Sequence, residues 1–283
     1  MTALHIPVLL DSVMAALGDI RGRHVVDCTF GAGGYSRAFL NAGAIVTAFD
    51  RDPNVADTAA AFQREFGDRF KFVPAPFSEI ATLAGQYDAI VFDLGISSMQ
   101  IDTGARGFSF RFDGPLDMRM SGAGQSAADL IENSSAADLA RILRDFGDVS
   151  RAGPIAHAMK DALPKTTFAL RDLIHNPKDI APVFQALRIA VNDEMGEVTR
   201  ALDAVPGLLV PGGRCVCVTF HSLEDRIVKN TFRTWTTAPG DPRLPVAASA
   251  PFEAMRPARP SDAELDANPR ARSAHMRGVI KSY

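Results

Sequence analysis

Residues 24–50 read HVVDCTFGAGGYSRAFLNAGAIVTAFD, and this stretch decides the fold. An apolar strand is expected at 24–30, and the glycine-rich turn Gly31-Ala32-Gly33-Gly34 ends it before a short helix begins. A second apolar run at 44–49 stops at Asp50. Strand, glycine-rich turn, helix, strand and acid form the opening unit of a doubly wound, Rossmann-like α/β fold that binds nucleotides.

The α/β pattern continues along the chain and is interrupted once. Further strands are expected at 70–73, at 88–92 before Asp93, at 214–220 before His221, and at 275–283 as an edge strand. The stretch between about 105 and 198 begins with a loop rich in Gly, Arg and Asp and continues in helical patterns. We therefore predict one α/β domain made of residues 1–104 and 199–283, with a helical insertion at 105–198. Residues 236–262, rich in Pro and Ala, are expected to form loops.

The composition is that of a soluble globular protein. The 283 residues are 47% apolar and 22% charged, enough for a sizeable core. Cys28, Cys215 and Cys217 lack metal-like spacing and are expected to be small, buried strand residues. The start of the chain lacks the pattern of a signal peptide, and no apolar run reaches membrane-spanning length, so we expect a cytoplasmic protein without a membrane partner. The net charge of −3 means that a nucleic-acid partner requires a local basic surface.

The glycine-rich turn alone leaves three interpretations open. It can be a simple chain reversal, a dinucleotide site or a site for S-adenosylmethionine. Ser36 stands where the G-x-G-x-x-G fingerprint of dinucleotide sites has its third glycine, which favours S-adenosylmethionine modestly. Asp50 is placed to accept hydrogen bonds from ribose hydroxyls, although an Asp before Pro53 and Asn54 can also cap a helix.

Long motifs further along the chain carry a resemblance. They read HIPVL at 5–9, DLGISSMQID at 93–102, RGFSF at 106–110, GPLDMRM at 114–120, FQALRIAVNDE at 184–194, FHSLEDR at 220–226 and NPRARSA at 268–274. In this order they closely resemble the bacterial 16S ribosomal RNA cytosine-N4 methyltransferase family, from the first motif to the last residues of the chain.

The resemblance implies a class I S-adenosylmethionine methyltransferase domain whose helical insertion recognises the substrate. It implies N4-methylation of cytidine 1402 in the decoding centre of 16S rRNA, within the small ribosomal subunit. No metal is implied, and homodimerisation is compatible with the sequence but not required. The positions that match the family's cofactor contacts are Gly33, Gly34, Tyr35, Asp50, Phe77, Asp93 and Gln100. The family usually has His where this chain has Tyr35; a backbone contact survives that change, whereas a role for an imidazole does not.

Two strand ends supply the candidate catalytic residues. The exocyclic amine of cytosine is a poor nucleophile, so the site needs hydrogen-bond acceptors near N4 as well as orientation. Asp93 is predicted to accept from the amine or to orient the cofactor, the alternative being a helix cap. His221 is predicted to relay the departing proton or to contact RNA, the alternative being a structural role. Asp193 and Glu194 are further candidate acceptors, although a solvated helix end explains them equally well.

Arginines and a lysine gather on segments that the fold is expected to bring to one rim. The predicted RNA-binding residues are Arg106, Arg111, Arg226, Lys229, Arg270, Arg272 and Arg277, and they supply the local basic surface. Phe108, Phe110 and Phe112 alternate in the loop and are candidates for a base-stacking platform, with core packing expected for at least two of them.

Other functions remain open at this point. The chain could methylate DNA or a protein instead of RNA. A ribosome-assembly factor that binds the cofactor but has lost catalysis is a second alternative, for which Tyr35 is the one suspicious feature. A dehydrogenase is remote, because the dinucleotide fingerprint is not met.

Overall fold

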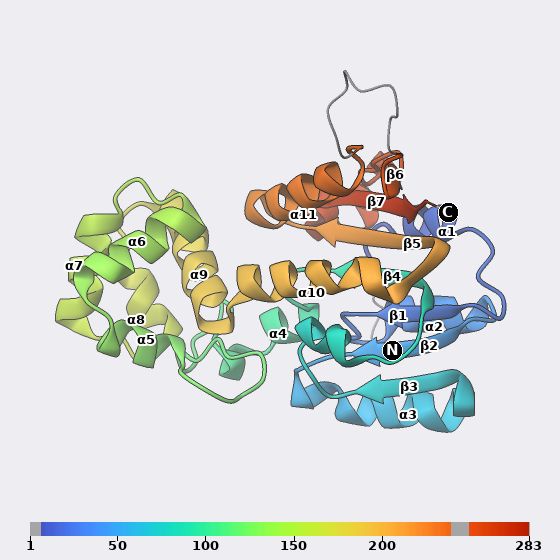
Figure 1. Cartoon of the computed structure of the whole chain (residues 1–283). Coiled ribbons are helices and arrows are strands. Elements are labelled where there is room, and N and C mark those ends of the chain that lie inside the picture. Colours follow the sequence, from blue (N-terminus) through green and yellow to red (C-terminus); the bar gives the residue numbers. More distant parts are fainter. Residues whose placement is uncertain (1–6, 239–248, 283) are drawn as a thin grey trace, which may run out of the picture. The chain divides into compact units, whose positions relative to one another are not determined.

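A computed structural model describes residues 7–238 and 249–282 (Figure 1). The chain forms two compact units. Residues up to Gly95 and from Met195 onward make the first unit, and Ile96–Glu194 make the second. The chain thus passes between the units after Gly95 and after Glu194, whereas the predicted boundaries lie at residues 104 and 198.

A seven-stranded sheet in the order β3-β2-β1-β4-β5-β7-β6 organises the first unit. The four pairings along β3-β2-β1-β4-β5 are parallel, and β7 runs antiparallel to β5 and to β6. The predicted Rossmann-like, class I methyltransferase sheet is confirmed by this order. The strands are β1 (His24–Asp27), β2 (Ile45–Phe49), β3 (Phe70–Val73), β4 (Tyr87–Asp93), β5 (Leu209–Thr219), β6 (Phe252–Ala254) and β7 (His275–Lys281).

Two predictions about the carboxyl-terminal part of the chain are wrong. The strand expected at the edge, β7, lies inside the sheet between β5 and β6. Residues 236–262 were expected to form loops, yet they contain β6, which covers the outer side of β7. The three residues of β6 are too few to produce a readable alternation, so their strand structure depends on the hydrogen bonds that β7 offers. The part of this stretch at 239–248 lies outside the described residues.

Alternate residues of each strand point to opposite faces of the sheet, and helices cover both faces (Figure 1). Val25 packs into a core with helices α1 (Leu10–Leu17), α2 (Gly34–Asn41) and α3 (Ala56–Phe66). Val26 packs into the core of the other face, with α10 (Glu194–Leu208), α11 (Ser222–Trp235) and the 3-10 segment η3 (Phe77–Thr82). After β6 the chain forms α12 (Asp262–Ala267) and η5 (Pro269–Ser273), and Ala271 of η5 joins the first core.

The second unit is helical and has a core of its own. Helix α6 (Ala136–Gly147) contributes Leu139 and Leu143, which are completely buried on one face of that helix. Ser135 caps α6 by accepting a hydrogen bond from the Asp138 backbone N–H at 3.1 Å, as its sequence pattern indicates. The other elements are α4 (Ser98–Asp102), η4 (Gly104–Arg106), α5 (Ala127–Asn133), α7 (Ala152–Ala162), α8 (Thr167–Asp172) and α9 (Pro177–Asn192).

The cysteines and the lengths of the helices bear on two predictions made from composition. Cys28, Cys215 and Cys217 are buried and form no disulfide, as expected of small strand residues. Within the described ranges, none of the helices combines the length and the apolar character that crossing a membrane requires.

Candidate cofactor site and active centre

The glycine-rich turn between β1 and α2 has a backbone that side chains would distort. Gly33 adopts φ +79°, and its N–H donates to the Phe30 carbonyl oxygen at 2.7 Å. A Cβ atom on Gly33 would lie 2.5 Å from Phe62, and one on Gly34 would lie 2.5 Å from Pro7. Packing therefore requires glycine at both positions, and the turn can offer a ligand only its backbone there.

Ser36 and Asp27 form a buried pair behind this turn. Ser36 Oγ donates to Asp27 Oδ2 at 2.6 Å, and the Thr29 N–H donates to Asp27 Oδ1 at 3.1 Å. Burial raises the pKa of Asp27 to about 6. Asp27 was not among the residues predicted for the site, although an acid inside the buried apolar strand of residues 24–30 was a readable signal.

Asp50 joins the end of β2 to the glycine-rich turn. Its Oδ2 accepts from the Gly31 N–H at 2.7 Å, and its Oδ1 accepts from the Asp52 N–H at 2.8 Å. The following 3-10 segment η1 (Pro53–Val55) is capped by Asp52 rather than by Asp50. The capping alternative for Asp50 is therefore excluded. A carboxylate has about four lone-pair sites, so Asp50 can still accept hydrogen bonds from ribose hydroxyls.

Tyr35 and Phe77 are both held by packing. The Tyr35 side chain is buried in the core beside Phe39, and its hydroxyl donates to the Val8 carbonyl oxygen. A cofactor contact from residue 35 would therefore use the backbone, because the ring and hydroxyl are engaged elsewhere. Phe77 begins η3 and meets Phe92 edge to face, with ring centroids 5.8 Å apart.

Asp93 ends β4 and carries a buried atom that needs a partner. Its backbone N–H donates to Thr29 Oγ1 at 2.8 Å, which joins the ends of β4 and β1. Asp93 Oδ1 is buried and has no hydrogen-bond partner within the described part of the chain. Burial, with smaller contributions from the charges of Asp27 and Glu224, raises the pKa of Asp93 well above its ordinary value. The N-cap of α4 is Ser97, which excludes the helix-cap alternative for Asp93.

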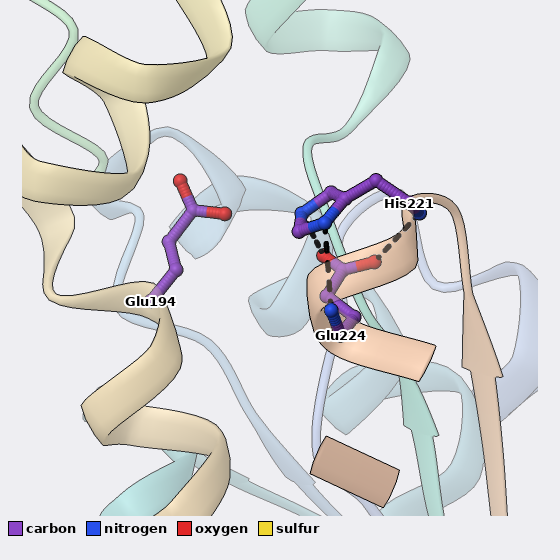
Figure 2. Close-up of side chains that lie close together, drawn as sticks. All are labelled: Glu194, His221 and Glu224. Carbon is purple, nitrogen blue, oxygen red and sulfur yellow. Dashed lines mark hydrogen bonds and ion pairs between the residues drawn. The ribbon is translucent and has the colours of Figure 1, made fainter. Parts of the chain in front are cut away.

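His221 starts α11 directly after β5, and Glu224 lies beneath it (Figure 2). His221 Nδ1 accepts from the Glu224 N–H at 3.4 Å, while Glu224 Oε2 accepts from the Phe220 N–H at 2.8 Å. His221 Nε2 lies 3.0 Å from Glu224 Oε1 as a potential ion pair, but it makes no hydrogen bond within the described part of the chain. His221 thus caps the helix, as its structural alternative required, and keeps a buried ring nitrogen unsatisfied. Glu224 was missed in the sequence, although a Glu three residues after a helix start is a capping pattern.

Glu194, also drawn in Figure 2, belongs to the second unit and is engaged there. It accepts from Arg188 Nε at 2.7 Å and from Arg188 Nη2 at 2.9 Å, and 5% of its surface is exposed. The alternative that Glu194 belongs to a solvated helix end is therefore wrong. Its carboxylate is buried, and the guanidinium of Arg188 compensates its charge. Asp193 is exposed, and its backbone forms the left-handed end of α9.

The other predicted site residues of the second unit are Gln100, Arg106 and Arg111, and they differ in how many contacts they make within that unit. Gln100 is buried in α4, and its Oε1 accepts from the Ser97 N–H at 3.1 Å. Arg106 Nη2 donates to the carbonyl oxygens of Arg119 and Met120, both at 3.0 Å, which holds the loop together. Arg111 is exposed. The assignment of Arg106 and Arg111 to RNA stays a prediction.

The predicted RNA-binding residues of the first unit lie on three elements. Arg226 and Lys229 are exposed on α11, and Arg270 and Arg272 are exposed on η5. Arg277 on β7 differs, because it donates to Asp225 through Nε at 2.7 Å and through Nη2 at 2.8 Å. Arg277 is therefore paired with Asp225, and the other four predicted residues of this unit are exposed.

The site as a whole suits a ligand that carries positive charge. Asp27, Asp93 and Glu224 place three carboxyl groups close enough to interact at the carboxyl ends of β1, β4 and β5. Asp93 still has an oxygen to offer, and Asp50 stands beside the glycine-rich turn. S-adenosylmethionine carries a sulfonium, an amino group and a ribose, so its chemistry fits these acceptors.

Known proteins resemble this chain along nearly its whole length. The model of the MraW methylase family matches residues 2–282. A protein of Rhizobium johnstonii named "Ribosomal RNA small subunit methyltransferase H" is 48% identical over 299 residues, covering 99% of this chain and 88% of that protein. Proteins of the same name from Chelativorans sp. and Methylorubrum extorquens are 48% and 47% identical and cover 99% and 97% of this chain, with 88% and 86% of their own lengths. This chain therefore belongs to the MraW methylase family.

Proposed function

We propose that this chain transfers a methyl group from S-adenosylmethionine to N4 of cytidine 1402 in the 16S rRNA of the small ribosomal subunit. The observation that carries the proposal is the buried, unpartnered Oδ1 of Asp93 at the end of β4, in a chain of a methylase family. Relatives that are 48% identical to this chain over the aligned residues are named as ribosomal RNA small subunit methyltransferases, which supports the RNA substrate. The choice of N4 and of this cytidine rests on the motifs at 93–120 and 184–226.

The cofactor supplies a methyl group made electrophilic by the sulfonium. On the protein side, Asp50 accepts from the ribose hydroxyls, since its oxygens retain lone pairs beside the two backbone bonds. The backbone at Gly33, Gly34 and Tyr35 lines the amino-acid portion. Phe77 and Gln100 complete the predicted contacts, with Phe77 held against Phe92.

Asp93 accepts a hydrogen bond from the exocyclic amine of the target cytosine. The amine lone pair is delocalised into the ring, so an acceptor that draws the amine toward tetrahedral geometry favours attack on the methyl group. Burial and the neighbouring acids raise the pKa of Asp93 and so favour its protonated form in the resting protein. Positive charge bound in the site favours its carboxylate form, which is the stronger hydrogen-bond acceptor.

His221 receives or passes on the proton that leaves the amine. The ring must then carry its hydrogen on Nδ1 so that Nε2 is free to accept, and the 3.4 Å contact from the Glu224 N–H to Nδ1 is given up in this form. Its Nε2 is buried without a hydrogen bond among the described residues, and a buried nitrogen in this state calls for a partner. The helical second unit recognises the substrate, with Arg106 and Arg111, while Arg226, Lys229, Arg270, Arg272 and Arg277 provide the basic surface of the first unit. Homodimerisation stays a prediction.

Labelled methyl transfer tests the function directly. Small ribosomal subunits from a strain that lacks the gene are incubated with the purified protein and radiolabelled S-adenosylmethionine, and the RNA is digested and analysed by mass. We expect label in N4-methylcytidine at one position of 16S rRNA. An intact N4-methylcytidine at that position in the deletion strain would contradict the proposed RNA target.

The same assay separates the alternatives. Transfer to DNA or protein without transfer to subunits would indicate another substrate. Binding of subunits and cofactor without any transfer would indicate an assembly factor that has lost catalysis. Thermal shifts with S-adenosylmethionine and with NAD distinguish a methyltransferase from a dehydrogenase.

A further inference from the structure

A hollow of about 380 Å³ lies on the outer part of the sheet, away from the glycine-rich turn. The residues that line it come from two short segments, one following β6 and one at the start of β7. Three of the six carry basic side chains. The lining residues are Pro257, Ala258, Arg259, His275, Met276 and Arg277.

The pairing of the two segments explains why the basic side chains share one face. Ala258 lies opposite Met276 in an antiparallel bridge, with N–H to carbonyl distances of 3.1 Å and 2.9 Å. Met276 is buried in the core on the face of α1 and α2. Side chains alternate along paired strands, so Arg259, His275 and Arg277 point to the opposite face, which α11 covers in part.

Helix α11 fixes one of these cations through Asp225. Arg277 donates to both Asp225 oxygens, which lowers the pKa of that carboxyl, and His275 Nδ1 lies 3.8 Å from Asp225 Oδ1. The two bonds use Nε and Nη2 of Arg277 and leave Nη1 without a hydrogen bond in the described ranges. A guanidinium immobilised in this way loses little freedom when it binds a further acceptor.

The local charge is positive in spite of the net charge of the chain. Arg259 is exposed and makes no ion pair with a residue that the structure describes. Lys229 of α11 is near enough to Asp225 to lower its pKa, after Arg277 and His275. Asp225 thus compensates Arg277, while Arg259 lines the same hollow without an ion pair in the described part of the chain.

A continuous row of paired residues joins the hollow to the candidate active centre. Asp93 lies opposite Val218, Val218 lies opposite Met276, and Met276 lies opposite Ala258. Neighbouring strands are about 4.8 Å apart, so three steps place the hollow roughly 14 Å from the Asp93 backbone. A nucleotide next to the target, or a few positions away, can span such a distance.

We propose that this hollow binds a backbone phosphate of the RNA strand that flanks the methylated nucleotide. Arg259 and Nη1 of Arg277 donate to the phosphate oxygens, because the planar guanidinium matches their geometry. His275 lines the same hollow and offers a ring nitrogen as a further polar contact. The site holds the register of the strand and carries no sequence information of its own. The inference rests on the proposed rRNA substrate and adds to it a second anchoring point outside the methyl-transfer centre.

The test compares two arginines on the same segment. Arg259→Ala removes a lining residue, whereas Arg256→Ala removes an exposed arginine that does not line the hollow. Fluorescence anisotropy measures the affinity of each full-length variant for a labelled 16S rRNA fragment over a salt series. We expect Arg259→Ala to weaken binding about tenfold and to reduce the slope of log K against log salt by about one, with Arg256→Ala like the parent protein. The kcat for saturating small subunits should stay unchanged while KM rises.

The outcomes separate the two proposals. If the parent protein methylates subunits and Arg259→Ala matches Arg256→Ala in affinity and salt slope, the phosphate site is overturned and the proposed function stands. If the parent protein neither methylates nor binds subunits, the proposed function falls and the phosphate site falls with it. Equal urea unfolding curves for both variants confirm that the comparison concerns folded protein.

Discussion

Ser36 Oγ donates a 2.6 Å hydrogen bond to Asp27 Oδ2, and neither residue has any exposed surface. The bond ties the carboxyl end of β1 to the first turn of α2, directly behind the glycine-rich turn. Position 36 is also the place where dinucleotide sites have their third glycine. The serine therefore has a structural reason of its own, since its hydroxyl donates to a buried carboxyl oxygen and glycine would remove that donor.

Ser36→Gly completes the dinucleotide fingerprint and should nevertheless harm the protein. Loss of the hydrogen bond to Asp27 costs about 1–3 kcal/mol, and glycine inside a helix costs about 1 kcal/mol more. We expect the free energy of unfolding in urea to fall by about 2–4 kcal/mol, and thermal shifts to show no gain of NAD binding. Ser36→Ala separates the two losses, because it removes the hydrogen bond and keeps the helix propensity. A stable Ser36→Gly variant that binds NAD would contradict this account.

Asp27 should make stability depend on pH in a direction opposite to that of most carboxyl groups. Its pKa in the folded protein, about 6, lies above the ordinary 3.8, so the folded state holds the proton more tightly. The resulting stabilisation is complete below pH 3.8 and is lost as the pH rises through about 6, with a full magnitude of about 3 kcal/mol. Urea unfolding between pH 4.5 and 7 measures it. Asp27→Asn should lack this component, and parallel pH curves for the two proteins would refute the assignment.

Asp93→Asn should separate catalysis from folding. The amide cannot become a carboxylate, so we expect kcat for methyl transfer to fall about 100-fold or more. In the parent protein the rate should rise with pH through the raised pKa of Asp93, and this limb should vanish in the variant. Calorimetry with S-adenosylmethionine shows whether the cofactor also loses affinity. Full methylation together with unchanged cofactor affinity would exclude Asp93 from both roles.

His221→Asn distinguishes a catalytic imidazole from a helix cap. Asparagine caps helices well, so the start of α11 should persist and the unfolding free energy should stay within about 0.5 kcal/mol. Without a ring nitrogen to take the proton, single-turnover methyl transfer should slow about 100-fold. His221→Ala serves as the comparison, since it removes the cap as well. Unchanged turnover in His221→Asn would leave His221 with the capping role alone.

The central strands were readable in the sequence because each strand of the opening unit is a buried apolar run with a sharp end. The same pattern placed Asp50, Asp93 and His221 at strand ends, where the carboxyl edge of a parallel sheet gathers side chains. The outer strands were not readable in this way. β6 has only three residues, too few to show an alternation of apolar and polar side chains. It becomes a strand by pairing with β7, and the sequence of β6 alone does not indicate that pairing.

The partners of the site residues could not be predicted from spacing. Glu224 and Asp27 affect Asp93 through space, and no periodicity in the sequence records that proximity. In the sequence, Tyr35 is visible only as a tyrosine in the cofactor loop where the family usually has His. Its hydroxyl in fact satisfies the Val8 carbonyl in the core, which only the packing of the amino-terminal segment against α2 reveals.

The loop aromatics Phe110 and Phe112 should respond to substitution in opposite ways. Phe110 packs edge to face on Phe184, with centroids 5.5 Å apart, whereas Phe112 is 51% exposed. The backbone around Phe112 is nevertheless fixed, because Thr167 Oγ1 donates to its carbonyl at 2.9 Å and the Phe168 N–H donates to Asp113 at 3.1 Å. An exposed ring on a fixed loop, next to the exposed Arg111, suits stacking on an unpaired base.

We therefore expect Phe112→Ala to weaken binding of an unpaired 16S rRNA fragment about 5- to 150-fold, because stacking on an aromatic ring contributes about 1–3 kcal/mol per base. Its unfolding free energy should change by no more than about 0.5 kcal/mol. Phe110→Ala should instead lower the unfolding free energy by about 2–4 kcal/mol, since it opens a cavity beside Phe184. Phe112→Trp should restore binding and report it through indole fluorescence. Equal RNA affinities for the parent protein and Phe112→Ala would show that the exposed ring does not meet the substrate, and the stacking assignment would then be wrong.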